Sequence, residues 1–301
     1  MSAPLKQRII VTGGRGRLAS LVAGHFRPPT KALELYSRQG GDGYFALNDL
    51  ASPERLSGTT ALLHFAWSTL PATSEEGAGS EFGVDLPSLQ KLLAALAELP
   101  AARRPLFVFF SSGGTAYGNA PGRPSLESDP LRPIGWYGRA KSAAEEIIQT
   151  NGVQAGLDCA ILRVSNPYGY PVPSNRAQGI IPHAVRCAIT QQPLTLWGDG
   201  TARKDFLYCT DFLAAVELVV DRRLTGTFNV AAGVSHSISE ILSLVETQTG
   251  REILLDRRPA HVWDVHDSLL NNDRFCAATG WRPQVSLAEG IRRAVSEFPS
   301  A

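Results

Sequence analysis

The fold of this chain is decided by residues 9–20, which read IIVTGGRGRLAS. The β-branched residues 9–11 predict a strand, the glycines after them predict a tight turn, and the apolar spacing that resumes at Leu18 predicts a helix. A strand, a glycine turn and a helix in this order aim free backbone N–H groups and the positive end of a helix at one point, which suits a pyrophosphate. We therefore predict a dinucleotide site here, with Gly13 and Gly16 supplying the turn and the close backbone approach.

The composition is that of an ordinary globular protein. The 301 residues are 44% hydrophobic, so they can bury a sizeable core in one large domain or two smaller ones. With 29 basic and 28 acidic residues the net charge is +1, which gives no electrostatic reason to expect a nucleic-acid partner. The sequence opens without an apolar signal region and has no apolar run long enough to span a membrane, so we expect a cytoplasmic protein.

The cysteines and histidines show no spacing typical of disulfides or metal sites. We expect no metal site, and we expect the four cysteines, which lie far apart in apolar surroundings, to be core thiols: Cys159, Cys187, Cys209 and Cys276. His64 lies in the apolar run of residues 61–67, so we expect a satisfied core residue rather than a catalyst.

A second strand, predicted over residues 31–38, bears on which dinucleotide is bound. An acidic residue about 20 positions after the glycines usually binds the adenosine ribose hydroxyls, but this strand ends in Ser37 and Arg38. Arg38, together with Arg15 and Arg17 of the glycine turn, suits the dianionic ribose 2′-phosphate of NADP better than a neutral hydroxyl pair. The sequence therefore favours NADP over NAD. The alternatives are solvated surface arginines and a ribose-binding role for Glu34.

Strands and helices alternate through the first half of the chain, as in a doubly wound parallel sheet. Further strands are predicted over residues 45–50, 61–67 and 106–110, and the polar, glycine-containing residues 68–83 are expected to form an active-site loop. The leucine spacing of residues 84–99 predicts a helix whose apolar face is either core or a dimer surface. These elements predict an α/β fold of the Rossmann type.

A tyrosine and a lysine four residues apart are the candidate catalytic pair. Residues 136–148 read WYGRAKSAAEEII and predict a helix on which Tyr137 and Lys141 share one face. A phenol titrates near 10, and a neighbouring cation that stabilises the phenolate by about 4 kcal/mol would bring its pKa near 7. A hydroxyl from the serine-rich turn at residues 111–115 can hold a substrate oxygen beside the phenol, because open α/β sheets bind ligands where strands end. The alternative is a Tyr–Lys pair on a solvated helix.

Taken in order, these motifs resemble one family along essentially the whole chain. It is the extended short-chain dehydrogenase/reductase family, in its NAD(P)-dependent nucleotide-sugar epimerase/dehydratase group, which includes UDP-glucose 4-epimerase. The resemblance rests on the glycine turn, HFAW (64–67), SSGGTAYG (111–118), YGRAK (137–141), LRVSNPYG (162–169), LTLWGDGTARKDFLYCTD (194–211), TFNVAAG (227–233) and GWRP (280–283).

The resemblance implies two domains and a homodimer. We expect residues 1–165 to form the NAD(P)-binding Rossmann domain, with residues 206–234 returning to it, and residues 166–301 to form a smaller α+β substrate domain. Further helices are expected over residues 179–189, 211–220, 237–249 and 287–298, and a strand over residues 227–230. Ser237 is the expected N-cap of the third of these helices, with Glu240 completing a capping box.

The resemblance also implies roles for individual residues. Tyr137 is the implied active-site base and Lys141 its partner, which also binds the nicotinamide ribose. The candidate cofactor-binding residues are Gly13, Arg15, Gly16, Arg17, Leu18, Arg38, Asp49, Leu50, Ala66, Tyr137 and Lys141. The candidate substrate-binding residues are Thr115, Asn166, Arg203, Lys204 and Arg258, of which Asn166 and Arg258 match ligands of the substrate diphosphate.

The chain departs from the family pattern at three places. The usual catalytic Ser/Thr falls on Gly113, so Ser112 or Thr115 must supply the hydroxyl, and Ser112 is favoured because it is adjacent. Lys204 replaces the usual arginine, which makes Arg203 beside it a candidate phosphate ligand. The arginines at the cofactor end resemble those of NADP-using members.

Three reactions share this scaffold. Dehydration is disfavoured because Gly114 and Thr115 stand where the family's dehydratases carry an acid pair. We predict a 4-epimerase, because residues 111–118 and 162–169 resemble sugar 4-epimerases of surface-polysaccharide pathways. The alternatives are an NADPH-dependent reductase of a nucleotide-linked 4-keto-6-deoxy sugar, and a catalytically silent cofactor-binding scaffold with Gly113 as the lesion. The sequence identifies neither the nucleotide nor the sugar.

Overall fold

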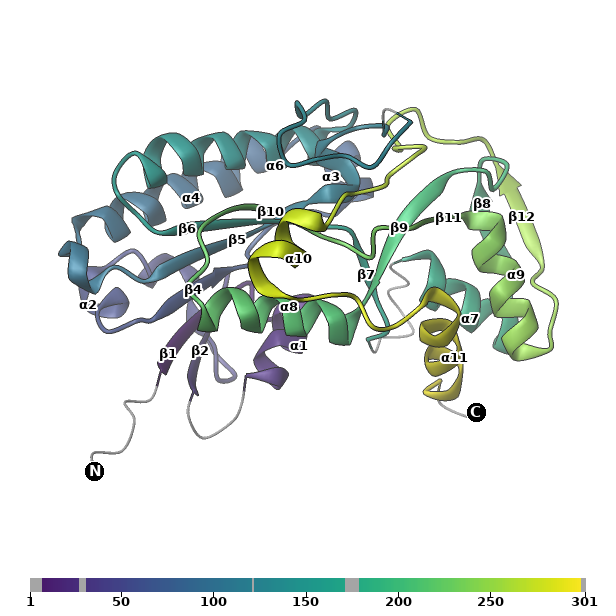
Figure 1. Cartoon of the computed structure of the whole chain (residues 1–301), viewed down its shortest axis with the longest axis horizontal. Coiled ribbons are helices and arrows are strands. Elements are labelled where there is room, and N and C mark those ends of the chain that lie inside the picture. The colour runs from purple at the N-terminus through teal and green to yellow at the C-terminus, as the bar shows by residue number, and fades with distance from the viewer. Residues whose placement is uncertain (1–6, 27–30, 121, 171–178, 299–301) are drawn as a thin grey trace. The chain divides into compact units, whose positions relative to one another are not determined.

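The computed structural model describes residues 7–26, 31–120, 122–170 and 179–298 (Figure 1). The chain divides into two compact units. Unit 1 takes the residues up to Ser112 together with Gly135–Arg163 and Val216–Phe228, and unit 2 takes Gly113–Ile134, Val164–Ala215 and the residues from Asn229 onward. The change of unit after Arg163 lies close to the boundary expected at residue 165. Residues 113–134, expected in the first domain, cluster instead with unit 2.

A seven-stranded sheet runs in the order β10-β6-β5-β4-β1-β2-β3. Its strands are β1 (Gln7–Thr12), β2 (Lys31–Ser37), β3 (Phe45–Ala46), β4 (Ala61–His64), β5 (Leu106–Ser112), β6 (Cys159–Val164) and β10 (Gly226–Val230). β1 pairs in parallel with both β2 and β4, so the strand order reverses at β1. In such sheets ligands bind beyond the carboxyl ends of the strands at the reversal, which here are the ends of β1 and β4. β10 joins this sheet, as expected for residues 227–230.

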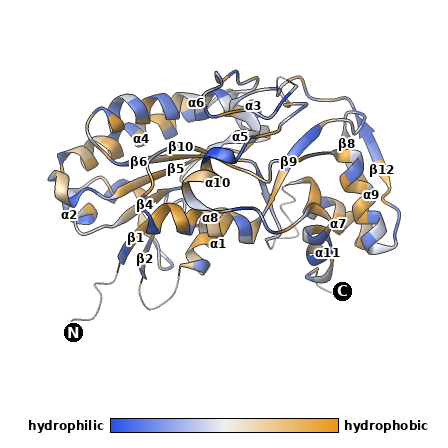
Figure 2. Ribbon diagram, in the orientation of Figure 1, coloured by the Kyte–Doolittle hydropathy of each residue, from blue (hydrophilic) through white to orange (hydrophobic). Residues whose placement is uncertain are grey.

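The sheet forms because its central strands are apolar on both faces. All four residues of β4 are buried, and so are the first six of β5. Figure 2 shows these central strands mainly in the colour of hydrophobic residues. Helix α1 (Arg17–His25) lies on one face, and α4 (Glu81–Glu98) and α6 (Trp136–Ile147) lie on the other (Figure 1). The leucines of α4 pack in one cluster with Phe107 and Phe109, so within the described residues the predicted apolar face of this helix is core.

Two predictions for the first half of the chain were wrong in part. Residues 68–83 are a loop only at 68–70 and 77–80; the others form α3 (Pro71–Glu76), where Pro71 occupies the first turn, and the start of α4. Residues 45–50 keep only the two-residue strand β3 and then turn into a 3₁₀ helix, Leu47–Asp49, which precedes α2 (Pro53–Leu56). The serine-rich turn likewise ends in a short helix, α5 (Gly113–Ala116).

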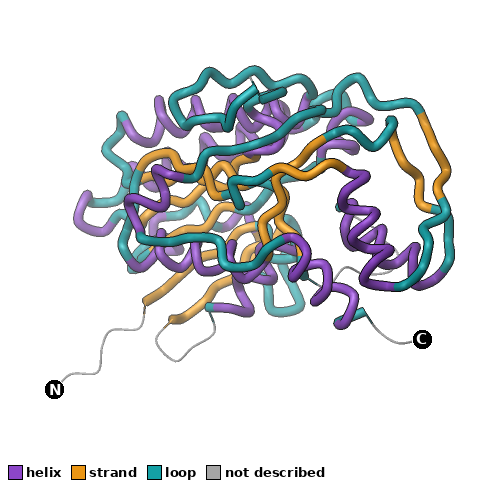
Figure 3. The backbone as a smooth tube through the Cα atoms, turned by 45° about the vertical axis from the view of Figure 1, so that its right-hand side comes forward, coloured by secondary structure: helices purple, strands orange, loops and turns teal. Residues whose placement is uncertain are grey.

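Unit 2 contains two small sheets and most of the helices of the second half. β7 (Asn166–Tyr168), β9 (Arg203–Tyr208) and β11 (Ser235–Ser237) form one sheet, and β8 (Leu194–Trp197) and β12 (Leu255–Arg258) run side by side in the other (Figure 3). Its helices include α7 (Ile180–Thr190), α9 (Ile238–Thr249), α10 (Asp273–Thr279) and α11 (Leu287–Ser296), and α8 (Cys209–Asp221) passes from unit 2 into unit 1. The capping box of α9 is confirmed, because Ser237 and Glu240 bond each other's backbone N–H.

The thiols and His64 are core residues, as predicted. All four cysteines are free and buried. His64 is 3% exposed, its Nδ1 lies 3.0 Å from Thr12 Oγ1, and burial lowers its pKa to about 3. In the part of the chain that the structure describes, no helix combines the length and apolarity that crossing a membrane requires, and no group of three or more His, Cys, Asp or Glu side chains is arranged to hold a metal ion.

Candidate active site

The glycine turn has the geometry of an anion cradle. Gly13 has a φ of 69°, and a Cβ there would lie 2.8 Å from the backbone of Phe65 and Ala66, so the position requires glycine. Gly16 N–H donates to Gly13 O at 2.7 Å, and Gly16 is the N-cap of α1 without a side-chain capping bond. The first-turn N–H groups of α1 thus face no capping side chain. This arrangement fits the pyrophosphate of a dinucleotide.

The end of β2 presents no carboxylate, and Glu34 does not fill that role. Glu34 forms a bidentate pair with Arg8 at 2.8 Å for both bonds, and the hydrogen-bonded guanidinium lowers the pKa of Glu34. Both oxygens of the Glu34 carboxylate therefore bind Arg8 in the middle of β2. Arg15 reaches the end of β2, where its Nε lies 3.4 Å from Ser37 Oγ, while its guanidinium stacks over Tyr44 and pairs with Asp42 at 3.1 Å.

The other cofactor candidates take up different environments in unit 1. Arg38 and Asp49 are exposed, whereas the side chain of Leu50 is buried in the core cluster. Arg17 and Leu18 are half-buried on the first turn of α1. Ala66 N–H donates to Thr12 Oγ1 at 3.1 Å, which fixes the chain after β4 against the glycine turn.

Tyr137 and Lys141 lie on one face of α6, as predicted. Lys141 is 5% exposed, and its Nζ is 5.7 Å from the centre of the Tyr137 ring. The ammonium also lies 3.8 Å from the Trp67 ring and 4.7 Å from the Phe109 ring, and it donates to Phe110 O at 3.0 Å. Its surroundings are therefore aromatic faces and one carbonyl oxygen.

The titration of this pair differs from the prediction. Burial lowers the pKa of Lys141 to about 7, although the charges of Asp85, Glu145 and Glu81 act in the opposite direction. Burial, followed by the charges of Glu81 and Asp85, raises the pKa of Tyr137 rather than lowering it. The sequence argument counted the cation beside the phenol but neither the loss of solvent nor two carboxyl groups from another helix.

Those two carboxyl groups were missed in the sequence. Glu81 and Asp85 lie one turn apart on α4; Glu81 is fully buried and accepts a hydrogen bond from Thr69 Oγ1, and Asp85 accepts one from Ser68 N–H at 3.1 Å. A signal was present, because positions 81 and 85 continue the i, i+4 stripe of the α4 leucines toward the N-terminus. Acidic residues on an apolar stripe are candidates for a functional site.

Of the two serines at the end of β5, Ser111 is buried and its hydroxyl is bound to a core carboxylate. Its Oγ donates to Glu145 Oε1 at 2.5 Å, and Arg163 binds the same carboxylate through Nη2 at 2.7 Å. Ser112, the last residue of β5, is half-buried and stays the favoured candidate for the missing hydroxyl.

In unit 2 the structure brings Asn166 near the short helix α5. A Cβ on Gly114 would lie 3.5 Å from the Asn166 amide, whose Nδ2 donates to Asp205 O at 2.8 Å. The Oγ1 of Thr115 is buried and has no hydrogen-bond partner among the described residues. Asp205 itself is structural: it accepts the N–H groups of Ala232 and Gly233, and burial raises its pKa to about 7.

The three candidate phosphate ligands have different partners. Arg203 donates to Ser235 O at 2.7 Å, and Lys204 pairs with Asp264 at 2.9 Å. Arg258, on β12, pairs with Asp256 at 2.9 Å and is more than half exposed.

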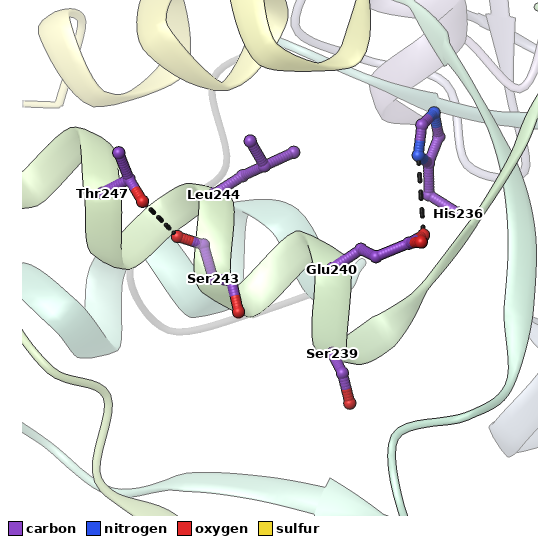
Figure 4. Close-up of a pocket in the computed structure, with 6 residues that line it drawn as sticks. All are labelled: His236, Ser239, Glu240, Ser243, Leu244 and Thr247. Atoms are coloured by element: carbon purple, nitrogen blue, oxygen red, sulfur yellow. Dashed lines mark hydrogen bonds and ion pairs between the residues drawn. The ribbon is translucent and has the colours of Figure 1, made fainter.

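A shallow groove runs along α9 in unit 2. Figure 4 shows its lining, which is His236 of β11 together with five residues of α9: Ser239, Glu240, Ser243, Leu244 and Thr247. Glu240 is occupied by the capping box, and Thr247 Oγ1 donates to Ser243 O within the helix. These polar groups serve the helix itself, so we do not assign a reaction to this groove.

Comparisons with known proteins agree with the fold and the motifs. A family model described as the NAD dependent epimerase/dehydratase family matches residues 9–231. A UDP-glucose 4-epimerase of Mycolicibacterium smegmatis is 30% identical over 207 residues, which are 68% of this chain and 66% of that protein. A dTDP-4-dehydro-6-deoxyglucose reductase of Escherichia coli is 27% identical over 193 residues, 64% of this chain and 60% of the relative. The matched segments thus span less than two thirds of the length of these relatives.

A solved structure is similar over nearly the whole length. The UDP-glucose 4-epimerase of Thermus thermophilus in complex with NAD has a TM-score of 0.85 and 27% sequence identity, covering 97% of this chain and 99% of that one.

Proposed function

Because the chain belongs to the NAD dependent epimerase/dehydratase family, we propose that it is an NAD(P)-dependent nucleotide-sugar 4-epimerase that works through a 4-keto intermediate. One observation carries the proposal: within unit 1, residues 65–67 join the glycine turn to the Tyr–Lys pair. The backbone of Phe65 and Ala66 lies against Gly13, and the next ring, Trp67, lies against Lys141 Nζ. This connection supports a nicotinamide end close to Tyr137.

In the proposed reaction Tyr137 handles the proton of the sugar C4 hydroxyl. When bound, the nicotinamide supplies a reversible hydride acceptor for C4. Tyr137 takes the hydroxyl proton as C4 becomes a ketone and gives it back when C4 is reduced on the opposite face, so the proton count is unchanged and the configuration is inverted. The Lys141 ammonium stabilises the phenolate, and Ser112, or Thr115 in its place, holds the C4 oxygen.

We propose that unit 2 binds the nucleotide diphosphate. Asn166, Arg203, Lys204 and Arg258 offer an amide and three cations, which suit phosphate oxygens. UDP-glucose and UDP-galactose are the first sugars to test, because relatives in the family are UDP-glucose 4-epimerases.

For the cofactor we propose NADP. The support is the absence of an acidic residue at the end of β2 and the position of Arg15 beside Ser37. The T. thermophilus relative is in complex with NAD, so the two dinucleotides must be compared directly. Titration of purified protein with each should show tighter binding of NADP, and Arg15→Ala should weaken NADP more than NAD. Tighter binding of NAD would overturn this choice.

The second candidate is a reductase of a nucleotide-linked 4-keto-6-deoxy sugar. It is favoured by the same arginine-bearing cofactor end and by the similarity to the E. coli reductase. A reductase would consume NADPH once per sugar, whereas an epimerase would show no net change in the reduced-nicotinamide absorbance.

The experiment that tests the proposal is Tyr137→Phe, which removes only the phenolic oxygen. We expect turnover to fall by about 100-fold or more while cofactor binding is kept, because one positioned acid–base group contributes that much. Tyr208→Phe is the matched control, since Tyr208 is a buried ring of β9 outside the proposed machinery, and should leave turnover unchanged. A protein that binds cofactor but turns over no nucleotide sugar would instead be the silent scaffold.

We propose further that the enzyme acts in the cytoplasm as a homodimer that supplies sugars for a surface polysaccharide. Light scattering of the purified protein should give twice the mass of one chain, and a single-chain mass would refute the dimer.

A further inference from the structure

Residues 67–69, which follow β4, each contact a charged group of unit 1; Lys141 and Glu81 are buried and Asp85 is half-buried. The ring of Trp67 lies 3.8 Å from Lys141 Nζ. Ser68 donates to Asp85 Oδ2 through both its N–H, at 3.1 Å, and its Oγ, at 2.5 Å. Thr69 Oγ1 donates to Glu81. The segment therefore connects the two acids of α4 to the lysine of α6.

The positions of Glu81 and Asp85 are unfavourable for the stability of the folded chain. Like charges one helical turn apart repel each other, and burial of a carboxylate is unfavourable without strong partners. Glu81 Oε2 is buried without a hydrogen-bond partner among the described residues, and burial raises the pKa of Asp85. Packing alone gives no reason for acids at these positions, since the leucines that follow on the same stripe fill the core.

The environment of Lys141 explains why an acidic residue stands at position 85. The rings and the carbonyl around its ammonium carry no net charge, and burial lowers the pKa of Lys141 to about 7. Among the charges that oppose this effect, Asp85 is the largest, followed by Glu145. The charge of Glu145 is balanced by its buried pair with Arg163, whereas the donors to Asp85 are the neutral groups of Ser68.

We infer that Asp85 is a positioning residue for the proposed reaction: its carboxylate, held by Ser68, favours the protonated form of the Lys141 amine beside Tyr137. The inference rests on the proposed function. Lys141 also interacts with four other titratable groups: Glu145 and Tyr137 of α6, Glu81 of α4 and His64 of β4. His64 is neutral at working pH, so it does not compete with this role.

The direct test is the titration of Lys141 in the holoenzyme. The chain has only five lysines, so carbon-13 labelling at lysine Cε gives a simple NMR spectrum, and Lys141→Met assigns the signal. Asp85→Asn keeps the shape and an oxygen that can accept from Ser68, but it removes the charge. We expect the pKa of Lys141 to fall by about one pH unit or more in this variant, as for the loss of an opposite charge nearby. Asp158→Asn, which removes an exposed carboxylate of the same unit, is the control that leaves the titration unchanged.

Activity supplies the second readout. In Asp85→Asn the high-pH limb of the kcat profile should move down in pH by the same amount, with KM little changed, and Asp85→Glu should restore it in part. If Asp85→Asn does not fold, Ser68→Ala, which weakens the hold on Asp85, should shift the titration in the same direction by a smaller amount.

The two proposals fail in different ways. An unchanged Lys141 titration in both variants overturns the role of Asp85, whatever the activity. A shifted titration in a protein that turns over no nucleotide sugar supports the effect of Asp85 on Lys141 and refutes the proposed reaction instead.

Discussion

Replacing Lys141 by methionine should change how the stability of unit 1 depends on pH and should abolish turnover. Methionine keeps the length of the side chain and its contact with the rings of Trp67 and Phe109, but it removes the buried amine. Burial lowers the pKa of Lys141 from 10.5 to about 7. The amine binds a proton more tightly in the unfolded chain than in the folded chain, so protonation of Lys141 favours unfolding of the wild type.

The sign follows from proton binding. Between about pH 7 and 10.5 the unfolded chain holds the Lys141 proton and the folded chain does not, so the stability of the wild type rises with pH across this window. Each pH unit within it is worth up to about 1.4 kcal/mol. From pH 7 to pH 9 the free energy of unfolding of the wild type should rise by about 2 kcal/mol relative to that of the variant, because every other titrating group is common to both proteins. This corresponds to a relative change in Tm of about 4–8 °C for a unit of this size.

The assay is calorimetric melting of both proteins, side by side, at pH 7, 8 and 9. Lys91→Met is the matched control, because Lys91 is exposed on α4 and its replacement should give a Tm difference that does not vary with pH. A difference between Lys141→Met and the wild type that stays constant from pH 7 to pH 9 would refute the assignment of a lowered pKa to Lys141.

Three further substitutions test other parts of the structure. Gly13→Ala places a Cβ 2.8 Å from backbone atoms at a φ of 69°, so calorimetric titration should show dinucleotide binding weakened about 10-fold or more. Arg163→Met leaves Glu145 buried without its ion-pair partner and should cost about 3–5 kcal/mol in urea unfolding, part of which returns when Glu145→Gln is added. Ser237→Ala removes the cap of α9 and should cost about 1 kcal/mol, measured as a lower urea midpoint for unit 2 with activity retained.

The parts of the fold that sequence predicted well are those set by local pattern. The strand, turn and helix around Gly13 follow from three adjacent signals that act within a dozen residues, and β4 and β5 follow from uninterrupted apolar runs. Residues 68–83 could not be assigned in this way. Helix α3 is only six residues long and polar, and it depends on Pro71 and on the bonds between Leu70 and Thr73, which do not stand out from a polar loop.

For the site, sequence predicted proximity but not electrostatics. The spacing of Tyr137 and Lys141 sufficed to place both on one face of α6, because i, i+4 geometry is local. Their pKa shifts depend on burial under Trp67 and on the acids of α4, which are brought there by tertiary packing. Spacing along one helix contains no information on either.

The central claim is tested most directly by the fate of the sugar and the cofactor together. Purified protein, with its bound nucleotide first released and identified, is incubated with UDP-glucose, and the C4 configuration of the product is read by proton NMR while the reduced-nicotinamide absorbance is followed. We predict conversion toward a mixture with UDP-galactose, or the same result with another nucleotide sugar, without net change in that absorbance. No interconversion of any nucleotide sugar, or stoichiometric consumption of NADPH with a 4-keto sugar, would contradict the account.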